Sequence, residues 1–241
     1  MIDGLGALAL RPLGRAAGLL FTTACLGLEP QVGVDAASFA RRAQRTARTL
    51  LAVQGVEVTC EGPSPEGPAV LVTNHVSYLD PLVVSLVAPC ISIAKGETGD
   101  WPLFGRGLRA LGVVFVRRGD PHSGALALFR AYRALREGTT VLNFPEGTTS
   151  DGRGVGPFHR GIFGLARLAG VPVVPAHLSY DDDRVPWFGG QTLAPHYLRL
   201  SRAAKVRARV RFAGAIRPAP SDEPHAIAAR ARDIVSALAD A

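Results

Sequence analysis

His75 and Asp80 are the residues of this chain whose types and spacing most directly suggest chemistry. They stand five positions apart in the stretch NHVSYLD, which follows an apolar run at residues 69–72. A neutral imidazole can accept a proton from a hydroxyl group, and a carboxylate on its other nitrogen fixes the tautomer and stabilises the resulting cation. Because no serine or cysteine stands in an obvious nucleophile elbow, we expect the pair to activate a hydroxyl group of the substrate itself. A helix-capping loop with a structural histidine is the alternative.

A second group of polar residues, FPEGTTS at positions 144–150, follows another apolar run. It combines the carboxylate of Glu146, a glycine that lets the backbone approach a ligand, and three hydroxyl groups. Such a loop can offer N–H groups to an anion or to a developing oxyanion. Taken alone, the stretch is equally typical of an ordinary turn.

From Gly55 onward, short apolar runs alternate with helical stretches, which is typical of an α/β domain. Several of the runs are rich in valine throughout, as expected for strands covered on both faces. The sequence predicts a mostly parallel central sheet flanked by helices, with strands at residues 56–60, 69–73, 90–94, 113–116, 140–144, 171–177 and 208–212 and helices at residues 80–88, 103–111, 122–137, 161–169 and 223–239. His75 and Glu146 then both follow the carboxyl ends of strands, where ligand sites gather in such sheets.

The first 54 residues predict helices that associate with a membrane. Residues 16–28 form an uncharged, mostly apolar run, which is shorter than the roughly 20 residues needed to span a bilayer. A segment that lies in or dips into one leaflet fits, with Arg11 and Arg15 at the head groups. A buried core helix is the alternative. We therefore expect residues 1–54 to form a membrane-associating segment and residues 55–241 to form the α/β domain.

Residues 35–54 predict a second helix, with Asp35 as its N-cap and Gly55 at its end. Apolar residues follow helical spacing on one side, and three arginines share another side: Arg41, Arg45 and Arg48. This basic face suits a membrane surface, and an ordinary solvated helix face is the alternative.

The composition narrows the classes of partner. The chain has 27 Lys and Arg against 20 Asp and Glu, a formal charge of +7, which suits anionic lipid, phosphorylated substrates or nucleic acid. No zinc-finger spacing, helix-turn-helix pattern or aromatic-studded basic strand is present, so we expect no nucleic-acid partner. Three widely spaced cysteines, Cys25, Cys60 and Cys90, indicate a reducing compartment. No second His/Asp cluster has metal-ligand spacing, so we expect no metal site.

Read together, four stretches resemble the motifs of the glycerolipid acyltransferase family, whose best-known members are 1-acylglycerol-3-phosphate O-acyltransferases. Its Asn-His-x-Ser-x-x-Asp motif is matched by Asn74, His75, Ser77 and Asp80. Its Gly-x-x-Phe-x-x-Arg motif is matched by Gly112, Phe115 and Arg118. Its Phe-Pro-Glu-Gly-Thr-Arg-Ser motif is matched at Phe144, Pro145, Glu146, Gly147, Thr148 and Ser150, and its Val-Pro-Val-x-Pro motif at Val171, Pro172, Val173 and Pro175. The resemblance covers roughly residues 56–180, with the motifs in the family's order.

The resemblance implies roles for these residues. His75 would be the general base on a glycerol hydroxyl, Asp80 would orient it, and Arg118 would hold the acceptor's phosphate. Val76 and Ser77 would lie near the start of a helix whose N–H groups are unpaired. The residues expected to bind substrate are Asn74, Ser77, Lys95, Gly112, Phe115, Arg118, Phe144, Pro145, Glu146, Gly147, Thr148 and Thr149. The donor would be acyl-CoA or acyl-carrier protein, with no metal or other cofactor, and the enzyme would sit on the cytoplasmic face of the inner membrane as a peripheral or monotopic protein.

One departure bears on the acceptor. Thr149 stands where the family has an arginine, which removes a second phosphate-binding charge; Arg153, His159 or Arg160 lie close enough in sequence to compensate. Residues 187–198 also resemble a bacterial sub-branch that includes lyso-ornithine lipid acyltransferases, whose acceptors lack a phosphate. Lysophosphatidate is therefore the first expectation and lyso-ornithine lipid the second. A metal-dependent hydrolase and a non-catalytic peripheral membrane protein are the alternatives from other classes.

Overall fold

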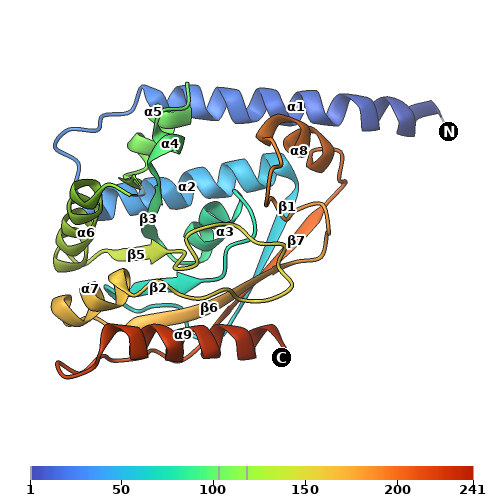
Figure 1. The fold of residues 1–241 in the computed structure, drawn as a ribbon. Helices are drawn as coiled ribbons and strands as arrows, with labels where there is room; N and C mark the ends of the chain where they lie inside the picture. The colour runs from blue at the N-terminus through green and yellow to red at the C-terminus, as the bar shows by residue number, and fades with distance from the viewer. Residues whose placement is uncertain (1, 103, 118, 241) are drawn as a thin grey trace.

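The computed structural model describes residues 2–102, 104–117 and 119–240, with side chains from residue 10 onward. Within these ranges one seven-stranded sheet has the order β1-β7-β6-β2-β5-β3-β4 (Figure 1). Neighbouring strands are parallel except β6 and β7, which are antiparallel, so the predicted mostly parallel sheet is confirmed. The strands are β1 (Val56–Glu61), β2 (Val70–Thr73), β3 (Cys90–Lys95), β4 (Val114–Val116), β5 (Thr140–Asn143), β6 (Val173–Tyr180) and β7 (Val206–Phe212).

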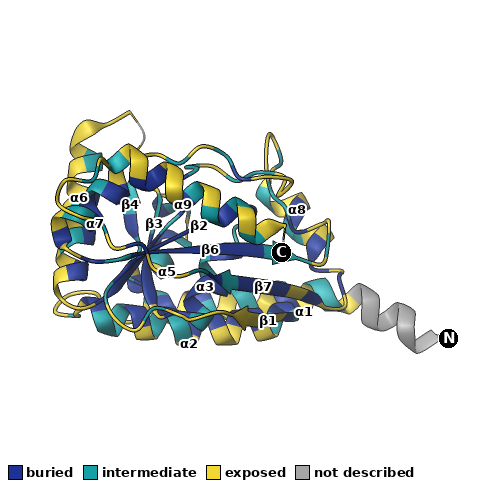
Figure 2. Cartoon of the chain, turned by 90° about the horizontal axis from the view of Figure 1, so that it is seen from below, coloured by how far each residue is buried: buried dark blue, intermediate teal, exposed yellow. Residues whose placement is uncertain are grey.

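Helices cover both faces of the sheet (Figures 1 and 2). α6, α7 and α9 pack on one face around Val70, Val72 and Phe163, while α2 and α3 pack on the other around Leu71 and Leu51. Burial on both sides explains why the central strands read as continuous apolar runs rather than alternating ones. The helices are α1 (Ile2–Gly27), α2 (Ala36–Gln54), α3 (Asp80–Val87), α4 (Gly96–Gly99), α5 (Phe104–Ala110), α6 (Pro121–Arg136), α7 (Gly161–Ala169), α8 (Leu193–Leu200) and α9 (Pro224–Ala239).

α1 is one continuous helix that runs through Pro12, and it packs on α2 and α5 (Figure 1). No described helix is long and apolar enough to cross a membrane. The buried guanidinium of Arg15 donates hydrogen bonds to the carbonyl oxygens of Ser201 at 3.0 Å, Ala203 at 2.8 Å and Ala204 at 3.3 Å. Arg15 was expected at the head groups of a membrane; instead it fastens α1 to the residues that follow α8, because these carbonyls have no other donor at the end of that helix.

α2 begins and ends as the sequence predicts. Asp35 accepts a hydrogen bond from the backbone N–H of Ser38, and Gly55 closes the helix with φ of 70°. Its apolar side belongs to the core through Ala47 and Leu51, while the predicted arginine face points to solvent. α2 is therefore part of the packed α/β body, and the boundary at residue 54 stays a prediction.

Two elements were not predicted, α4 and α8, and β1, β3, β6 and β7 extend beyond their predicted bounds. β6 continues to Tyr180 rather than ending at residue 177. The extra residues pair with β7 through Leu178 with Val210 and Tyr180 with Ala208, which keeps the strand extended. This extension carries Tyr180 to the edge of the sheet where the polar loops gather.

Candidate active site

The loop between β2 and α3 holds the imidazole and the carboxylate together. Nδ1 of His75 lies 2.7 Å from Oδ2 of Asp80, whose side chain is fully buried. Because a carboxylate only accepts, His75 donates from Nδ1, which leaves the lone pair on Nε2 as the base. The side chain of His75 is 19% exposed, so a substrate hydroxyl can reach the imidazole.

Asp80 also accepts hydrogen bonds from its own loop and from the sheet. The backbone N–H groups of Val76 and Ser77 donate to Oδ2 at 2.7 and 2.9 Å, and the hydroxyl of Tyr180 donates to Oδ1 at 2.7 Å. The N–H groups of Val76 and Ser77 are therefore already paired and are not free donors. The carboxylate at the first turn of α3 folds back and takes both donors, as a capping side chain does.

The second motif packs directly against the first. The ring of Phe144 stacks on the imidazole of His75 with centroids 4.0 Å apart. The two oxygens of Glu146 accept from different segments: Oε1 from the N–H of His75 at 2.9 Å and Oε2 from the N–H of Gly156 at 3.0 Å. Burial raises the pKa of Glu146, although these two N–H groups oppose the rise. Glu146 thus ties the histidine's backbone to the loop at residues 151–160.

The turn after Glu146 presents backbone donors. Gly147 has φ of 72°, and its N–H closes a turn on the carbonyl oxygen of Phe144 at 3.0 Å, while Pro145 accepts from His159 at 2.9 Å. Within the described residues, the N–H groups of Thr148 and Thr149 have no hydrogen-bond partner. Two consecutive free N–H groups beside a left-handed glycine are the kind of donors that can bind an anion.

Asn74 and Ser77 support the loop rather than face a substrate. Asn74 is buried, and its amide bridges the backbone of Leu178, accepting from N–H at 2.8 Å and donating to the carbonyl oxygen at 2.9 Å. Ser77 is also buried, and its Oγ accepts from the N–H of Leu79 at 3.3 Å. Asn74 therefore fixes the end of β2 to its neighbour β6.

The predicted residues on β3 and β4 lie farther along the same edge. Since β5 and β3 separate β2 from β4, the ends of β2 and β4 are about 14 Å apart at the usual strand spacing. Lys95 is exposed and pairs with Glu97 at 3.6 Å. The ring of Phe115 lies under the guanidinium of Arg109, 5.8 Å from its centroid.

Gly112 has a backbone reason for its identity, because its φ is 71° and an added Cβ would lie 2.6 Å from Phe39. Arg118 lies outside the described residues. The structure therefore brings the His75 and Glu146 motifs into contact, while Lys95, Gly112 and Phe115 lie farther along the edge of the sheet.

Residues 186–196 brace the loop between β2 and α3, the candidate catalytic loop, and sequence reasoning did not assign them this part. The N–H of Trp187 donates to the carbonyl oxygen of Val76 at 2.8 Å. His196 donates from Nε2 to the carbonyl oxygen of Pro186 at 3.1 Å, so its Nδ1 accepts from the hydroxyl of Tyr78 at 3.2 Å. Burial lowers the pKa of His196, which favours the neutral imidazole that these two hydrogen bonds require. The resemblance of residues 187–198 to a family sub-branch was the one available signal.

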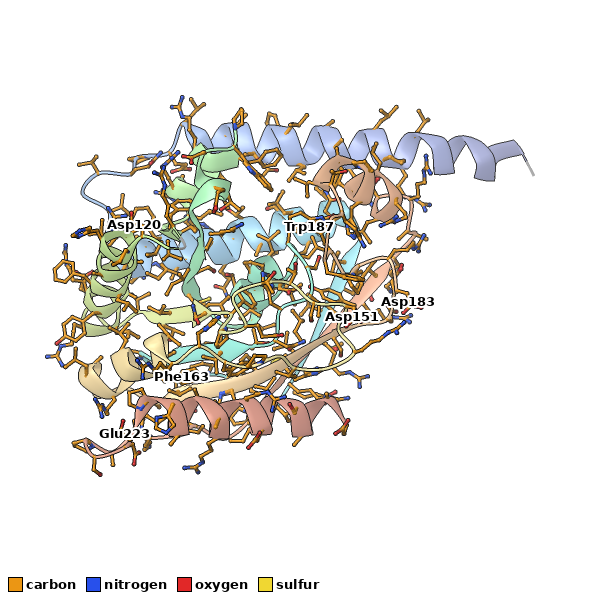
Figure 3. All side chains as sticks on the ribbon, viewed as in Figure 1. Asp120, Asp151, Phe163, Asp183, Trp187 and Glu223 are labelled. Carbon is orange, nitrogen blue, oxygen red and sulfur yellow. The ribbon has the colours of Figure 1, made fainter. Side chains whose placement is uncertain are left out.

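A cleft of about 660 Å³ opens beside Val76, between the loop at residues 151–153 and the carboxyl end of β6. Figure 3 labels two acidic residues of its lining, Asp151 and Asp183, which lie close together in that view. The lining is Val76, Asp151, Gly152, Arg153, His177, Leu178, Ser179, Tyr180, Asp182, Asp183, Pro186 and Phe188. No cluster of three or more His, Cys, Asp or Glu side chains that could hold a metal occurs among the described residues.

Comparison with known proteins agrees with this geometry. A family model described as Acyltransferase matches residues 55–179. A lyso-ornithine lipid O-acyltransferase from Pseudomonas aeruginosa is 35% identical over 177 residues, covering 71% of this chain and 67% of the relative. A 1-acyl-sn-glycerol-3-phosphate acyltransferase from Neisseria meningitidis is 30% identical over 202 residues, covering 79% and 78%.

The fold also matches a solved structure, the 1-acyl-sn-glycerophosphate acyltransferase PlsC from Thermotoga maritima. The TM-score is 0.63 at 21% identity, over 83% of this chain and 78% of that one. The resemblance read from the four motifs is confirmed: this chain belongs to the acyltransferase family.

Proposed function

We propose that the enzyme transfers an acyl group from a thioester to the free hydroxyl of a lysolipid, with His75 as general base. Nε2 of His75 takes the hydroxyl proton while the alcohol oxygen attacks the thioester carbonyl. The C–S bond then breaks, and the imidazolium returns the proton to the leaving sulfur. The observation that carries this proposal is the 2.7 Å contact between Nδ1 of His75 and the fully buried Asp80, which leaves Nε2 as the basic nitrogen of a partly exposed side chain.

The turn of the second motif supplies the complementary charge stabilisation. The free N–H groups of Thr148 and Thr149 are suited to the oxyanion that forms on the thioester carbonyl. We expect Glu146 to act indirectly, without contacting the substrate, because both of its carboxylate oxygens accept hydrogen bonds from the backbone N–H groups of His75 and Gly156. Its role is to hold the loop that contains His75 in a fixed position relative to the loop at residues 151–160.

The first acceptor we propose is 1-acylglycerol-3-phosphate, with acyl-CoA or acyl-carrier protein as donor and no other cofactor. The Neisseria relative is named for this reaction, and the Gly112, Phe115 and Arg118 motif that implies phosphate binding is intact in the sequence. An arginine suits a phosphomonoester because its planar fork binds two oxygens at once.

Lyso-ornithine lipid is the second acceptor, and one specific observation favours it. Among the described residues, the cleft beside Val76 is lined by Asp151, Asp182 and Asp183 against Arg153, and Arg184 pairs with Asp182, so three carboxylates face two guanidinium groups. This lining suits a head group with an amine better than a phosphate dianion, and Thr149 removes the second arginine of the family motif. The Pseudomonas relative is named for that acceptor.

We also propose that the enzyme binds the cytoplasmic face of the cell membrane through α1. Among the described side chains of this helix, residues 10–27, the exposed ones are uncharged, and they include four large apolar ones: Leu10, Leu13, Leu20 and Phe21. An apolar helix face of this kind lies in the interface between head groups and acyl chains. Flotation with vesicles tests the proposal by comparing the full chain with Leu13→Asp/Phe21→Asp, which should remain in the soluble fraction.

The reaction is tested with the purified full chain and labelled acyl-CoA or acyl-carrier protein, with lysophosphatidate and lyso-ornithine lipid as acceptors in parallel. His75→Ala should lower the rate of acyl transfer about 10²–10⁴-fold with whichever acceptor is used. His225 is an exposed histidine on α9, and His225→Ala should leave this rate unchanged. Arg118→Ala should raise the KM of lysophosphatidate alone. Full activity of His75→Ala would refute the general-base mechanism, and turnover of lyso-ornithine lipid alone would replace the first acceptor by the second.

A further inference from the structure

The two oxygens of the Asp80 carboxylate have separate partners. Oδ2 faces the catalytic loop and accepts from Nδ1 of His75 and from the N–H groups of Val76 and Ser77. Oδ1 faces the sheet and accepts from the hydroxyl of Tyr180 at 2.7 Å. Tyr180 is thus the one described side chain besides His75 that donates to this fully buried carboxylate.

Tyr180 comes from an element far from the motif in sequence. It is the last residue of β6, 100 positions after Asp80, and its pairing with Ala208 of β7 fixes the strand there. Burial and the neighbouring Asp80 raise the pKa of Tyr180 well above its usual value. The phenol therefore stays protonated at any pH at which the enzyme works, and it remains a donor throughout.

We propose that Tyr180 is a positioning residue that sets the basicity of His75 through Asp80. A hydrogen bond from Tyr180 stabilises the ionised carboxylate, which then attracts the imidazolium proton less strongly. His75 consequently becomes the neutral base at a lower pH than it would beside a less satisfied carboxylate. This inference rests on the proposed role of His75 and Asp80, and it adds a residue outside the four motifs.

The other polar side chains near His75 and Asp80 have hydrogen-bond partners of their own. Glu146 faces His75 from the loop after β5, where its oxygens accept from backbone N–H groups rather than from the imidazole. Tyr78 of the catalytic loop lies near Tyr180, and its own hydroxyl donates to His196. Neither group donates to Asp80, so removing the Tyr180 hydroxyl changes the carboxylate without changing these neighbours.

The test is the pH profile of kcat/KM for Tyr180→Phe. The acid limb, which reports deprotonation of His75 in the free enzyme, should move to higher pH by roughly half a unit to one unit. The plateau value of kcat should fall by up to about tenfold with KM unchanged, because the carboxylate loses one of its anchors. Tyr132→Phe removes a hydroxyl from a half-buried tyrosine on α6 and should leave the profile unchanged.

A second variant keeps the test independent of lost packing. 3-Fluorotyrosine at position 180 has a more acidic phenol and donates more strongly, so the acid limb should move to lower pH. A titration of His75 followed by ¹⁵N NMR should show both shifts directly. An acid limb that stays in place in both variants overturns the inference, even if kcat falls. Loss of activity in His75→Ala together with an unshifted Tyr180→Phe would refute the role of Tyr180 alone, whereas an active His75→Ala would refute the proposed mechanism itself.

Discussion

Replacing Glu146 by Gln separates a bracing role from contact with the acceptor. In the structure, Oε1 accepts from the N–H of His75 and Oε2 from the N–H of Gly156. A glutamine side chain keeps one acceptor but turns an NH₂ group toward the other N–H donor. One loop must therefore lose its bond, whichever way the amide is turned.

The size of the effect follows from that single lost bond. A hydrogen bond to a charged group contributes about 1.5–3 kcal/mol, so the free energy of unfolding of Glu146→Gln should fall by about that amount. For a chain of 241 residues this corresponds to a drop in Tm of about 3–12 °C, at about 2–4 °C per kcal/mol. The value of kcat should fall at least about tenfold, because a displaced His75 backbone moves the base away from its substrate.

Urea denaturation and steady-state kinetics with a varied acceptor measure both quantities on the same preparation. The matched control is Glu137→Gln, which removes an exposed charge paired with Arg133 on α6 and should change stability by less than about 0.5 kcal/mol. If Glu146→Gln keeps its stability while the acceptor's KM rises, then Glu146 binds the acceptor and the bracing argument is wrong.

Two further predictions concern buried groups that take no part in the proposed chemistry. Arg15→Ala should lower the free energy of unfolding by about 2–4 kcal/mol in urea denaturation, since three carbonyls lose their charged donor, whereas the exposed Arg41→Ala should have little effect. His177 is buried with Nδ1 unpartnered, and burial, followed by Arg211, lowers its pKa below 6.5. Since the unfolded chain then binds more protons, stability should fall as the pH drops below about 6.5, and His177→Leu should flatten this dependence in denaturation curves at pH 5–8.

The catalytic loop was predictable because its chemistry and its position are both local. An apolar run predicts the strand, and His75 follows the end of that strand within the same short stretch. The same reasoning places Glu146 after β5, and the parallel pairing of β2 with β5 then brings the two loops together. Placing His75 and Glu146 therefore requires no long-range contact other than the pairing of strands within the sheet.

The residues that hold the loop between β2 and α3 in place, Tyr180 and Trp187, were not predictable, because each reaches the loop through a long-range contact. Tyr180 reaches Asp80 only because β6 extends three residues beyond its predicted end, where pairing with β7 overrides the weak local signal of Leu178 and Ser179. Trp187 reaches the carbonyl oxygen of Val76 from a loop without regular structure. Local patterning carries little information about such contacts, since a one-residue change in strand register reverses the direction of every side chain.

The net positive charge of the chain likewise does not predict by itself which surface binds a membrane. Alternate positions of β7 place Arg207, Arg209 and Arg211 on one face, and each of them is paired in the structure, with Asp181 or Glu61. Three arginines share two carboxylates, so most of the charge of this face is balanced; such a face attracts anionic lipid weakly, and the remaining attraction is screened at physiological salt. The membrane contact proposed for this enzyme is therefore better supported by the uncharged side of α1 than by its net charge of +7.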